Sequence, residues 1–449
     1  MALSRFFGRG RDNPTPAADD ATTESVPDAA PEAEADDASE PEFEEGTPEE
    51  APDTSWLMRA DAALATGAST GSKRADKLYG HAEPDLPTHF TTARGARFTD
   101  VFGIEYLDCT MALGAVALGY AEPRVTRAVM EAASQGNVCG LSSWREVELA
   151  ERLCAIIPCA ERAQILKTGA EATSAAVRLA RTYTGREQII ACGYFGWHDW
   201  SSDSPGVPAS VRKTVDWIPF DEIGALELAV AAAKSSLAAI VIEPIVDHLP
   251  SVEWLQRARE LADANGAVLI FDEIKTGFRV APGGYQEVCG VTPDLATFGK
   301  AMANGYPVAA VVGQRALMEA ARDTWISSTL ASESTALAAA LAVLDWHDEA
   351  NICETLGETG KEMRDAVDRA IAASGVEGAH TEGTDHMWSI KWADRALENR
   401  FVSQAMREGV LFKRGAYNFP AIAHLEAELQ EIERAASAAL VSLMDDENA

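Results

Sequence analysis

Two hydrophobic patterns alternate between residues 120 and 300. Short, almost wholly apolar segments predict strands at 163–166, 188–191, 238–242 and 267–271. Segments with an apolar residue every three or four positions predict helices at 122–133, 144–157, 171–184, 221–234 and 252–264. Strands without a polar face, separated by helices, indicate an α/β fold with a mostly parallel sheet covered on both faces. The carboxyl ends of such strands meet at one edge, where ligands bind.

The pattern changes after residue 333. It becomes mostly helical there, with strand candidates at 386–391 and 410–413. We therefore expect a smaller α+β layer at the C-terminal end of the chain.

The net charge of −32 is concentrated near the N-terminus. Residues 1–53 contain three arginines against 16 acidic side chains, a net charge of −13. Because this stretch has few large apolar residues, it cannot bury enough surface to offset the entropy lost on ordering. We expect a disordered acidic tail, either a solvated extension or an arm that binds a partner. The acidic balance argues against a nucleic-acid or anionic-membrane partner.

Membrane and redox signals point to a cytoplasmic protein. No stretch approaches the roughly 18 consecutive apolar residues of a membrane span, and the first residues lack the apolar run of a secretory signal. The seven cysteines are scattered, without a Cys-x-x-Cys pair. Isolated cysteines at apolar positions are typical of free thiols in a reducing compartment.

Three features fall where predicted strands end. One strand enters a helix through Thr168-Gly169-Ala170, and exposed amides at a helix N-terminus suit a phosphate. Another ends at Asp272, where a buried carboxylate is costly unless it is paired or caps a helix. Lys300 is the one charged residue between 295 and 313, so burial would lower its pKa unless the amine reaches solvent. Each feature alone has an ordinary structural explanation.

Together the three features match the requirements of pyridoxal 5'-phosphate (PLP). A lysine forms an imine with this cofactor, a carboxylate keeps the pyridine nitrogen protonated, and a helix N-terminus anchors the phosphate. The combination predicts a PLP enzyme that acts on a small molecule. No metal site is expected.

A family resemblance supports this hypothesis. The segment Phe271-Asp-Glu-Ile-Lys-Thr-Gly-Phe-Arg279, followed by Thr297-Phe-Gly-Lys300, resembles the signature of class III aminotransferases, which are fold-type I PLP enzymes. Within that class the chain is most similar to glutamate-1-semialdehyde aminomutases and their sugar- and amino-acid-modifying relatives. The resemblance covers residues 67 to 424.

The resemblance implies a domain organisation and a partner. It implies a large PLP-binding domain at 113–331 and a smaller α+β domain built from both ends of the chain, at 54–112 and 332–449. It also implies a homodimer with shared active sites.

Roles for single residues around the cofactor ring follow from the resemblance. Lys300 would form the Schiff base with PLP and move the proton during amino transfer. Asp272 would pair with the pyridine nitrogen. Ile274 would pack on one face of the ring, and Tyr194 would stack on the other.

The resemblance also implies the phosphate contacts. The backbone amides of Gly169 and Ala170 would bind the phosphate, and Thr329 would reach the phosphate of the neighbouring subunit. Glu243 matches a position near the cofactor, although capping explains it equally well.

Departures from the family pattern fall beside the cofactor and on the substrate half of the site. Ala170 stands where many relatives carry a hydroxyl, and Phe195 replaces a histidine. Residues 409–418 lack the glutamate-containing pattern of the semialdehyde aminomutases. Lys73 or Arg74 occupies the place where those enzymes hold a substrate carboxylate.

Three functions remain open at this point. The first is class III amino transfer between small amino and keto (or sugar-derived) compounds through Lys300. The second is the intramolecular amino exchange of a glutamate-1-semialdehyde 2,1-aminomutase. The third is a catalytically lapsed PLP-fold scaffold.

Overall fold

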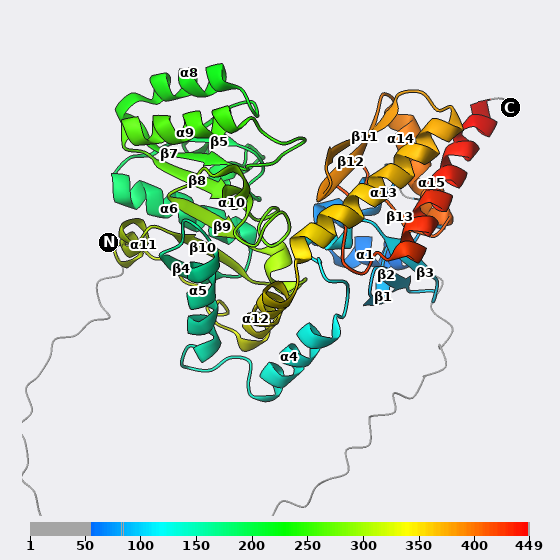
Figure 1. Ribbon diagram of the computed structural model, residues 1–449, viewed down its shortest axis with the longest axis horizontal. Coiled ribbons are helices and arrows are strands. Elements are labelled where there is room, and N and C mark those ends of the chain that lie inside the picture. Colours follow the sequence, from blue (N-terminus) through cyan, green and yellow to red (C-terminus); the bar gives the residue numbers. More distant parts are fainter. Residues whose placement is uncertain (1–54, 82, 84, 448–449) are drawn as a thin grey trace, which may run out of the picture. The chain divides into compact units, whose positions relative to one another are not determined.

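Seven strands form the largest sheet, in the order β4-β10-β9-β8-β7-β5-β6 (Figure 1). The strands are β4 (Arg162–Leu166), β5 (Gln188–Cys192), β6 (Val215–Trp217), β7 (Leu237–Ile242), β8 (Val268–Asp272), β9 (Leu295–Phe298) and β10 (Ala309–Gly313). Only β10 runs antiparallel to its neighbours within this sheet. The computed structural model describes residues 55–81, 83 and 85–447, so the predicted acidic tail at 1–53 lies outside the described residues.

Helices cover both faces of this sheet. Helix α6 (Gly169–Thr184) packs on one face against alternate strand residues such as Ala239 and Val241. Helices α8 (Ile223–Ala233) and α9 (Val252–Asn265) pack on the other face against the intervening residues, such as Ile240. Alternate residues of a strand point to opposite faces, and here both sets are buried. The predicted α/β arrangement is therefore confirmed.

A helical layer lies beside this sheet. It comprises α4 (Pro123–Ser134), α5 (Trp144–Ile156) and α12 (Ser334–Glu349). Apolar residues of α5 and α12 share one core with residues of β9 and β10. This core supports the backbone that follows β9.

A second, four-stranded sheet joins the two ends of the described chain. Its order is β1 (Phe90–Arg94), β2 (Arg97–Asp100), β3 (Glu105–Asp108) and β13 (Val410–Leu411). Strands β3 and β13 are parallel, with Leu107 opposite Val410. The smaller α+β part is therefore built from both ends, as the fold class predicts.

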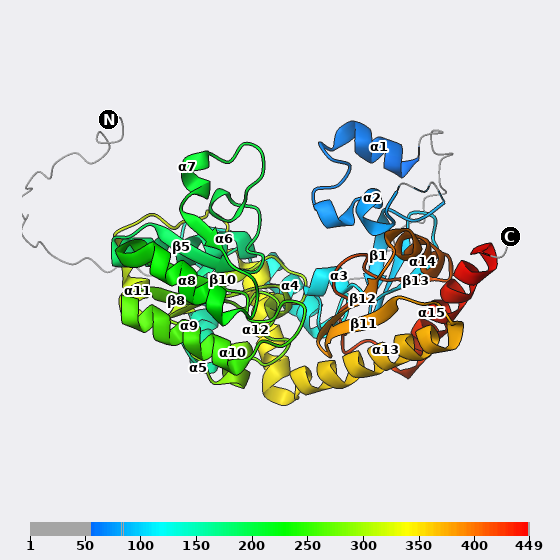
Figure 2. The ribbon, with the colours of Figure 1, turned by 90° about the horizontal axis from the view of Figure 1, so that it is seen from above.

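Long helices surround the smaller sheet. They are α13 (Ile352–Ser374), α14 (Arg395–Arg407) and α15 (Glu426–Glu447), together with the hairpin of β11 (Ala379–Thr384) and β12 (Met387–Trp392). Figure 2 shows β13 next to α14 and α15, which it contacts. No helix in the described ranges is both long and apolar enough to cross a membrane.

Short helices complete the described structure. They are α1 (Trp56–Ala63), η1 (Gly71–Lys73), α2 (Ala75–Leu78), α3 (Met111–Gly114), η2 (Asp199–Ser201), α7 (Ala209–Arg212), η3 (Lys234–Ser236), α10 (Tyr285–Cys289), η4 (Lys300–Ala303), α11 (Arg315–Glu319) and η5 (Ala320–Arg322). Within α3, Met111, Ala112 and Leu113 have φ values of 42°, 50° and 61°. These residues form a left-handed turn rather than an ordinary helix.

Candidate active site

Lys300 lies directly after the end of β9 and opens the short helix η4. Its φ of 44° is left-handed, a conformation that costs energy for a residue with a side chain. Burial, together with the positive charge of Lys275, lowers the pKa of its amine, and the negative charges of Glu243 and Asp272 oppose this shift. The resulting pKa is about 8. Near neutral pH a minor fraction of the amine is unprotonated, far more than for a lysine in solvent.

Asp272 ends β8 and is paired in register with Thr297 on β9. Its side chain is 4% exposed, and Oδ1 accepts hydrogen bonds from the Ile274 amide at 3.0 Å and from Thr297 Oγ1 at 2.9 Å. Burial and the nearby charge of Glu243 raise the pKa of the carboxyl to about 7, although the two hydrogen bonds and the charge of Lys300 oppose the rise. A buried carboxylate held in this way is stabilised by any cation placed beside it.

Glu243 and Lys275 form a buried ion pair next to these two groups. Lys275 Nζ lies 2.7 Å from Glu243 Oε1 and 4.2 Å from the centre of the Tyr417 ring. Glu243 Oε2 also accepts the amide of Tyr194 at 3.0 Å. Sequence reasoning missed Lys275 as part of the site. The available signal was its place within the signature segment, three residues after Asp272.

The N-terminus of α6 faces the same region. Thr168 caps the helix in a reciprocal arrangement with Glu171. A Cβ placed on Gly169 would lie 3.2–3.3 Å from three carbons of Ile274, and one on Gly299 would lie 3.1 Å from Ile274 Cδ1. Ile274 is therefore seated between the α6 N-terminus and the residue before Lys300.

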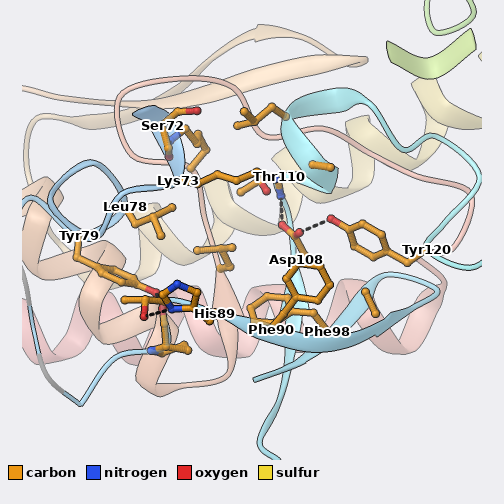
Figure 3. A pocket seen from close by; sticks show the side chains of 17 residues that line it. Ser72, Lys73, Leu78, Tyr79, His89, Phe90, Phe98, Asp108, Thr110 and Tyr120 are labelled. Carbon is orange, nitrogen blue, oxygen red and sulfur yellow. Dashed lines mark hydrogen bonds between the residues drawn. The ribbon is translucent and has the colours of Figure 1, made fainter. Parts of the chain in front are cut away.

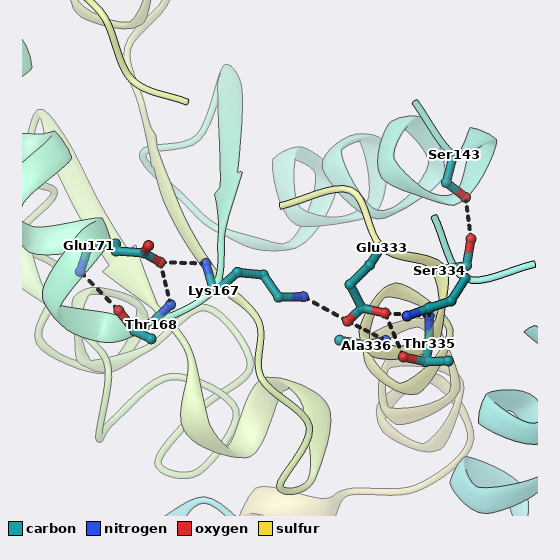
Figure 4. Close-up of polar contacts among 9 residues, drawn as sticks. Ser143, Lys167, Thr168, Glu171, Glu333, Ser334, Thr335 and Ala336 are labelled. Atoms are coloured by element: carbon teal, nitrogen blue, oxygen red, sulfur yellow. Dashed lines mark hydrogen bonds and ion pairs between the residues drawn. The ribbon is translucent and has the colours of Figure 1, made fainter. Parts of the chain in front are cut away.

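A buried ion pair fixes this helix end. Lys167 Nζ lies 2.7 Å from Glu333 Oε1, and the two side chains are only 13% and 7% exposed. Figure 4 shows Lys167 reaching from the turn before α6 to the first turn of α12, which Glu333 caps. The glycine turn and the segment that precedes α12 are thus held together by one charge pair.

The structure places the aromatic residues after β5 in opposite environments. Tyr194 is 74% exposed, whereas Phe195 is buried against Trp200 and Trp217. The Phe195 ring therefore belongs to the core on the α6 face of the sheet. The next residue, Gly196, approaches Ala170 so closely that a Cβ on it would lie 2.5 Å from the Ala170 Cβ.

Three further predicted residues lie in surface segments. Thr329 is exposed in the turn before α12, and Lys73 is exposed at the end of η1. Arg74 is bound to Asp76 through two hydrogen bonds of 2.9 and 3.1 Å. In this structure Arg74 is therefore already paired, whereas Lys73 has no ion-pair partner among the described residues.

A family model described as class-III aminotransferase matches residues 78–199 and 209–432. The chain belongs to the class III aminotransferases. It is 32% identical over 381 residues to the 3-aminobutyryl-CoA aminotransferase of Cloacimonas acidaminovorans, which covers 82% of this chain and 91% of that protein. The 2'-deamino-2'-hydroxyneamine transaminase of Streptomyces kanamyceticus is 34% identical, with coverage of 87% and 99%.

The comparisons include an aminomutase and a PLP-containing structure. The glutamate-1-semialdehyde 2,1-aminomutase of Polynucleobacter asymbioticus is 31% identical, with coverage of 77% of this chain and 89% of that protein. The FumI protein of Sphingopyxis sp. MTA144, solved in its PLP internal aldimine form, superimposes with a TM-score of 0.83 at 28% identity, covering 88% and 97% of the two chains. This class III aminotransferase is therefore an enzyme of the fold-type I group that transfers amino groups with PLP as its cofactor.

The residues of the chain fit this cofactor. A lysine amine with a lowered pKa, a buried carboxylate and a helix N-terminus that carries a glycine lie around Ile274 and Glu243. This donor set offers a nucleophile, an acceptor for a protonated ring nitrogen and amides for a phosphate.

Proposed function

We propose that the enzyme moves an amino group between two small molecules, a donor amine and a keto acceptor, and that Lys300 is the lysine that binds PLP covalently. One observation carries this proposal: the Lys300 amine, with its pKa lowered to about 8, is electrostatically coupled to the buried Asp272 carboxylate. An amine that titrates near neutral pH can both attack a carbonyl and exchange a proton.

The proposed roles divide between the two groups. Bound PLP supplies an electron-withdrawing ring that stabilises negative charge on the substrate carbon. Asp272 would accept a hydrogen bond from the protonated ring nitrogen and so keep the proton there, because its carboxylate is held in place by Thr297 and by the amide of Ile274. Lys300 would take the proton from the substrate Cα and deliver it to the C4′ atom of the cofactor, which its lowered pKa favours.

The other proposed contacts hold the ring and the phosphate of the cofactor in position. Ile274 is rigidly seated against Gly169 and Gly299, which supports its proposed place under one face of the ring. Tyr194 is exposed and its backbone is held by Glu243, which supports a role on the other face. The amides of Gly169 and Ala170, at the start of α6, would bind the phosphate.

We also propose a homodimer in which Thr329 contacts the phosphate bound in the partner subunit. The loop at 137–144 contacts the start of α12. The Ser334 amide donates a hydrogen bond of 2.8 Å to the Asn137 carbonyl. Around these loops, Leu141 is 81% exposed and Trp144 is 64% exposed. Large apolar side chains with this much exposed surface are typical of protein–protein interfaces, which supports contact with a second copy of the chain. A monomeric mass by light scattering for the PLP-loaded protein would contradict the dimer.

Transfer between two molecules is favoured over intramolecular exchange. Residues 409–418 lack the glutamate-containing pattern of the aminomutases. We propose Lys73 as a substrate-carboxylate ligand, with Arg74 as an alternative if Asp76 releases it. A cytoplasmic location fits the seven cysteines, all of which are free thiols.

The proposed role of Lys300 is tested by absorbance and reduction. Purified protein with PLP should be yellow, and borohydride should fix the cofactor to the chain. Lys300→Ala should bind no reducible cofactor. A wild-type protein that takes up no PLP, or a Lys300→Ala variant that is still modified by borohydride, would overturn the assignment.

The type of transfer is tested by substrate requirements. We expect turnover only when an amino donor and a separate keto acceptor are both supplied. Formation of 5-aminolevulinate from glutamate-1-semialdehyde, with the enzyme in its pyridoxamine phosphate form and no added keto acid, would establish the aminomutase instead.

A further inference from the structure

A cavity of about 190 Å³ lies beside the four-stranded sheet, outside the Lys300 cluster. Its walls come from residues 72–79 and 87–93, from β2 and β3, from the turn at 110–113 and from the end of β13 (Figure 3). Most of the lining is apolar and includes Leu78, Phe90, Phe98, Leu113 and Leu411. The cavity therefore suits a hydrocarbon group.

Two of the polar groups on the wall are already satisfied by the protein. Asp108 Oδ1 accepts the amides of Thr110 and Met111 at 2.5 and 3.2 Å, and its Oδ2 accepts the Tyr120 hydroxyl at 2.6 Å (Figure 3). The Tyr79 hydroxyl donates to the Pro87 carbonyl at 2.6 Å. These hydrogen bonds within the protein already satisfy both groups, so neither needs a ligand as a partner.

Lys413 is different. Its side chain lines the cavity and is 93% buried by the protein, since only 7% of the residue is exposed. The ammonium donates to one acceptor, the Ser72 carbonyl at 3.1 Å, and within the described residues no carboxylate lies within 4.0 Å of Nζ. An ammonium has three donors, so two remain to be used. Lys73, on the same wall, adds a second positive charge at the rim.

One turn of chain and Arg279 link the wall of the cavity to the surroundings of the proposed catalytic lysine. The left-handed residues Ala112 and Leu113 form part of its wall. The next residue, Gly114, offers its carbonyl to Arg279 Nη2 at 3.0 Å, and Arg279 is one of the charges that act on Lys300. Residues with side chains adopt this left-handed conformation only where the surrounding structure holds them in place.

We infer that this cavity receives the far end of the amino or keto substrate, that this end is an apolar chain carrying a carboxylate, and that Lys413 binds the carboxylate. The inference rests on the proposed function for the reacting end of the substrate. A ligand with one negative charge balances the single positive charge of the buried Lys413 ammonium. The two unused N–H groups of this ammonium can donate charge-assisted hydrogen bonds to the two carboxylate oxygens. Lys413 thus acts together with Lys73, the carboxylate ligand proposed above, in selecting an acidic substrate.

The test uses the PLP-loaded enzyme and a carboxylate that cannot react. Titration calorimetry with hexanoate should show binding to the wild type, and Lys413→Met should weaken it about 10- to 100-fold, as expected for a lost charge-assisted bond. Hexan-1-ol, which has the chain without the charge, should bind both proteins equally. Lys77→Met, at a lysine whose side chain is 56% exposed, should bind hexanoate as the wild type does.

Two further variants keep the test decisive. Lys413→Gln removes the charge while keeping a polar side chain, and it should weaken hexanoate binding if Lys413→Met does not fold. Leu113→Trp should block the cavity for hexanoate and hexan-1-ol alike. Equal hexanoate affinity in the wild type and in a folded Lys413 variant, or no hexanoate binding to the wild type, would overturn the inference. Because the PLP absorbance is read separately, loss of cofactor binding is distinguishable from loss of carboxylate binding.

Discussion

Lys300 and Lys413 are both largely buried amines with lowered pKa values, but their surroundings differ. Lys300 follows a buried strand and is coupled to two carboxylates, Asp272 and Glu243, that follow neighbouring strands of the same sheet. Lys413 has a backbone carbonyl as its acceptor and sits among loops that are 341 residues apart in sequence. The difference indicates that the chemistry of the site depends on strand ends, whereas its selectivity depends on long-range loop contacts.

We expect the largest effect when the buried ion pair between Lys167 and Glu333, which holds the N-terminal end of α6, is broken. Glu333→Gln leaves the Lys167 ammonium buried without its partner, so the free energy of unfolding should fall by about 3–5 kcal/mol. Urea unfolding of the PLP-loaded protein measures this. Glu349→Gln is the control, because Glu349 ends α12 and pairs with Arg124 of α4, but its side chain is 59% exposed. Equal destabilisation by both variants would show that the burial of the first pair is irrelevant.

We expect Asp272→Asn to raise the stability of the cofactor-free protein and to lower the amino-transfer rate of the PLP-loaded enzyme. Because the folded pKa of about 7 exceeds the unfolded value of 3.8, cofactor-free wild type loses stability as the pH rises between these values. The asparagine variant avoids this loss and should be about 2–4 kcal/mol more stable than wild type at pH 8 without cofactor. Its amino-transfer rate should fall about 10²- to 10³-fold. Thermal unfolding at pH 5 and pH 8 tests the first point, since the difference should be less than half as large at pH 5 and should vanish only below about pH 4.

The rate of PLP uptake by cofactor-free protein should rise with pH. The unprotonated Lys300 amine becomes the major form above pH 8, so below that pH the rate should fall about tenfold per unit. Stopped-flow absorbance measures this rate. Lys275→Met removes a neighbouring positive charge and should move the midpoint to higher pH. An unchanged midpoint would contradict the electrostatic account of the shift.

Gly169→Ala should disturb the seat of Ile274. The added Cβ would lie 3.2–3.3 Å from three Ile274 carbons, so the variant should lose about 1–3 kcal/mol of stability and bind PLP more weakly. Gly224→Ala is the matched control, because nothing lies within 4 Å of a Cβ there. Equilibrium titration with PLP distinguishes the two variants. Wild-type affinity in Gly169→Ala would show that this contact does not shape the cofactor site.

The smallest effect is expected from removal of residues 1–53. The net charge of −13 in this segment has no link to the predicted chemistry, so PLP affinity and amino-transfer rate should remain within twofold of the full chain. Steady-state kinetics of the shortened protein provide the measurement. A large loss of either quantity would assign the tail a role in the enzyme.

The sequence predicts the large sheet well because its buried strands carry no polar face. The strand predicted at 238–242 is β7, and the predicted helix at 252–264 is α9, each to within one residue at either end. The helix predicted from residue 171 begins instead at Gly169, because Thr168 caps it. Strands β6, β9 and β10 were not predicted; β6 has only three residues, and only the short helix η4 separates β9 from β10.

The smaller sheet was harder to predict. Strands β1 and β2 expose residues on both faces, so their sequence lacks both an apolar run and clear alternation. The strand predicted at 410–413 ends at Leu411, because the Lys413 amide donates to the Asn418 side chain at 2.8 Å instead of to a neighbouring strand.

The candidate site divides in the same way. Lys300 and Asp272 could be predicted because both follow buried strands within one 29-residue signature. Lys413 could not, because its importance depends on Ser72 and on a cavity whose walls come from both ends of the chain. The roles of Tyr194 and Thr329 stay predictions, since both side chains are exposed.

The pairing of β3 with β13 sets an order of events during synthesis. Leu107 leaves the ribosome about 300 residues before its partner Val410, which at roughly 5–20 residues per second is a delay of some 15–60 s. The seven-stranded sheet, complete by Gly313, can form in that interval. A nascent chain therefore assembles the strand ends around Lys300 first, and the cavity lined by Lys413 is finished only when translation is almost over.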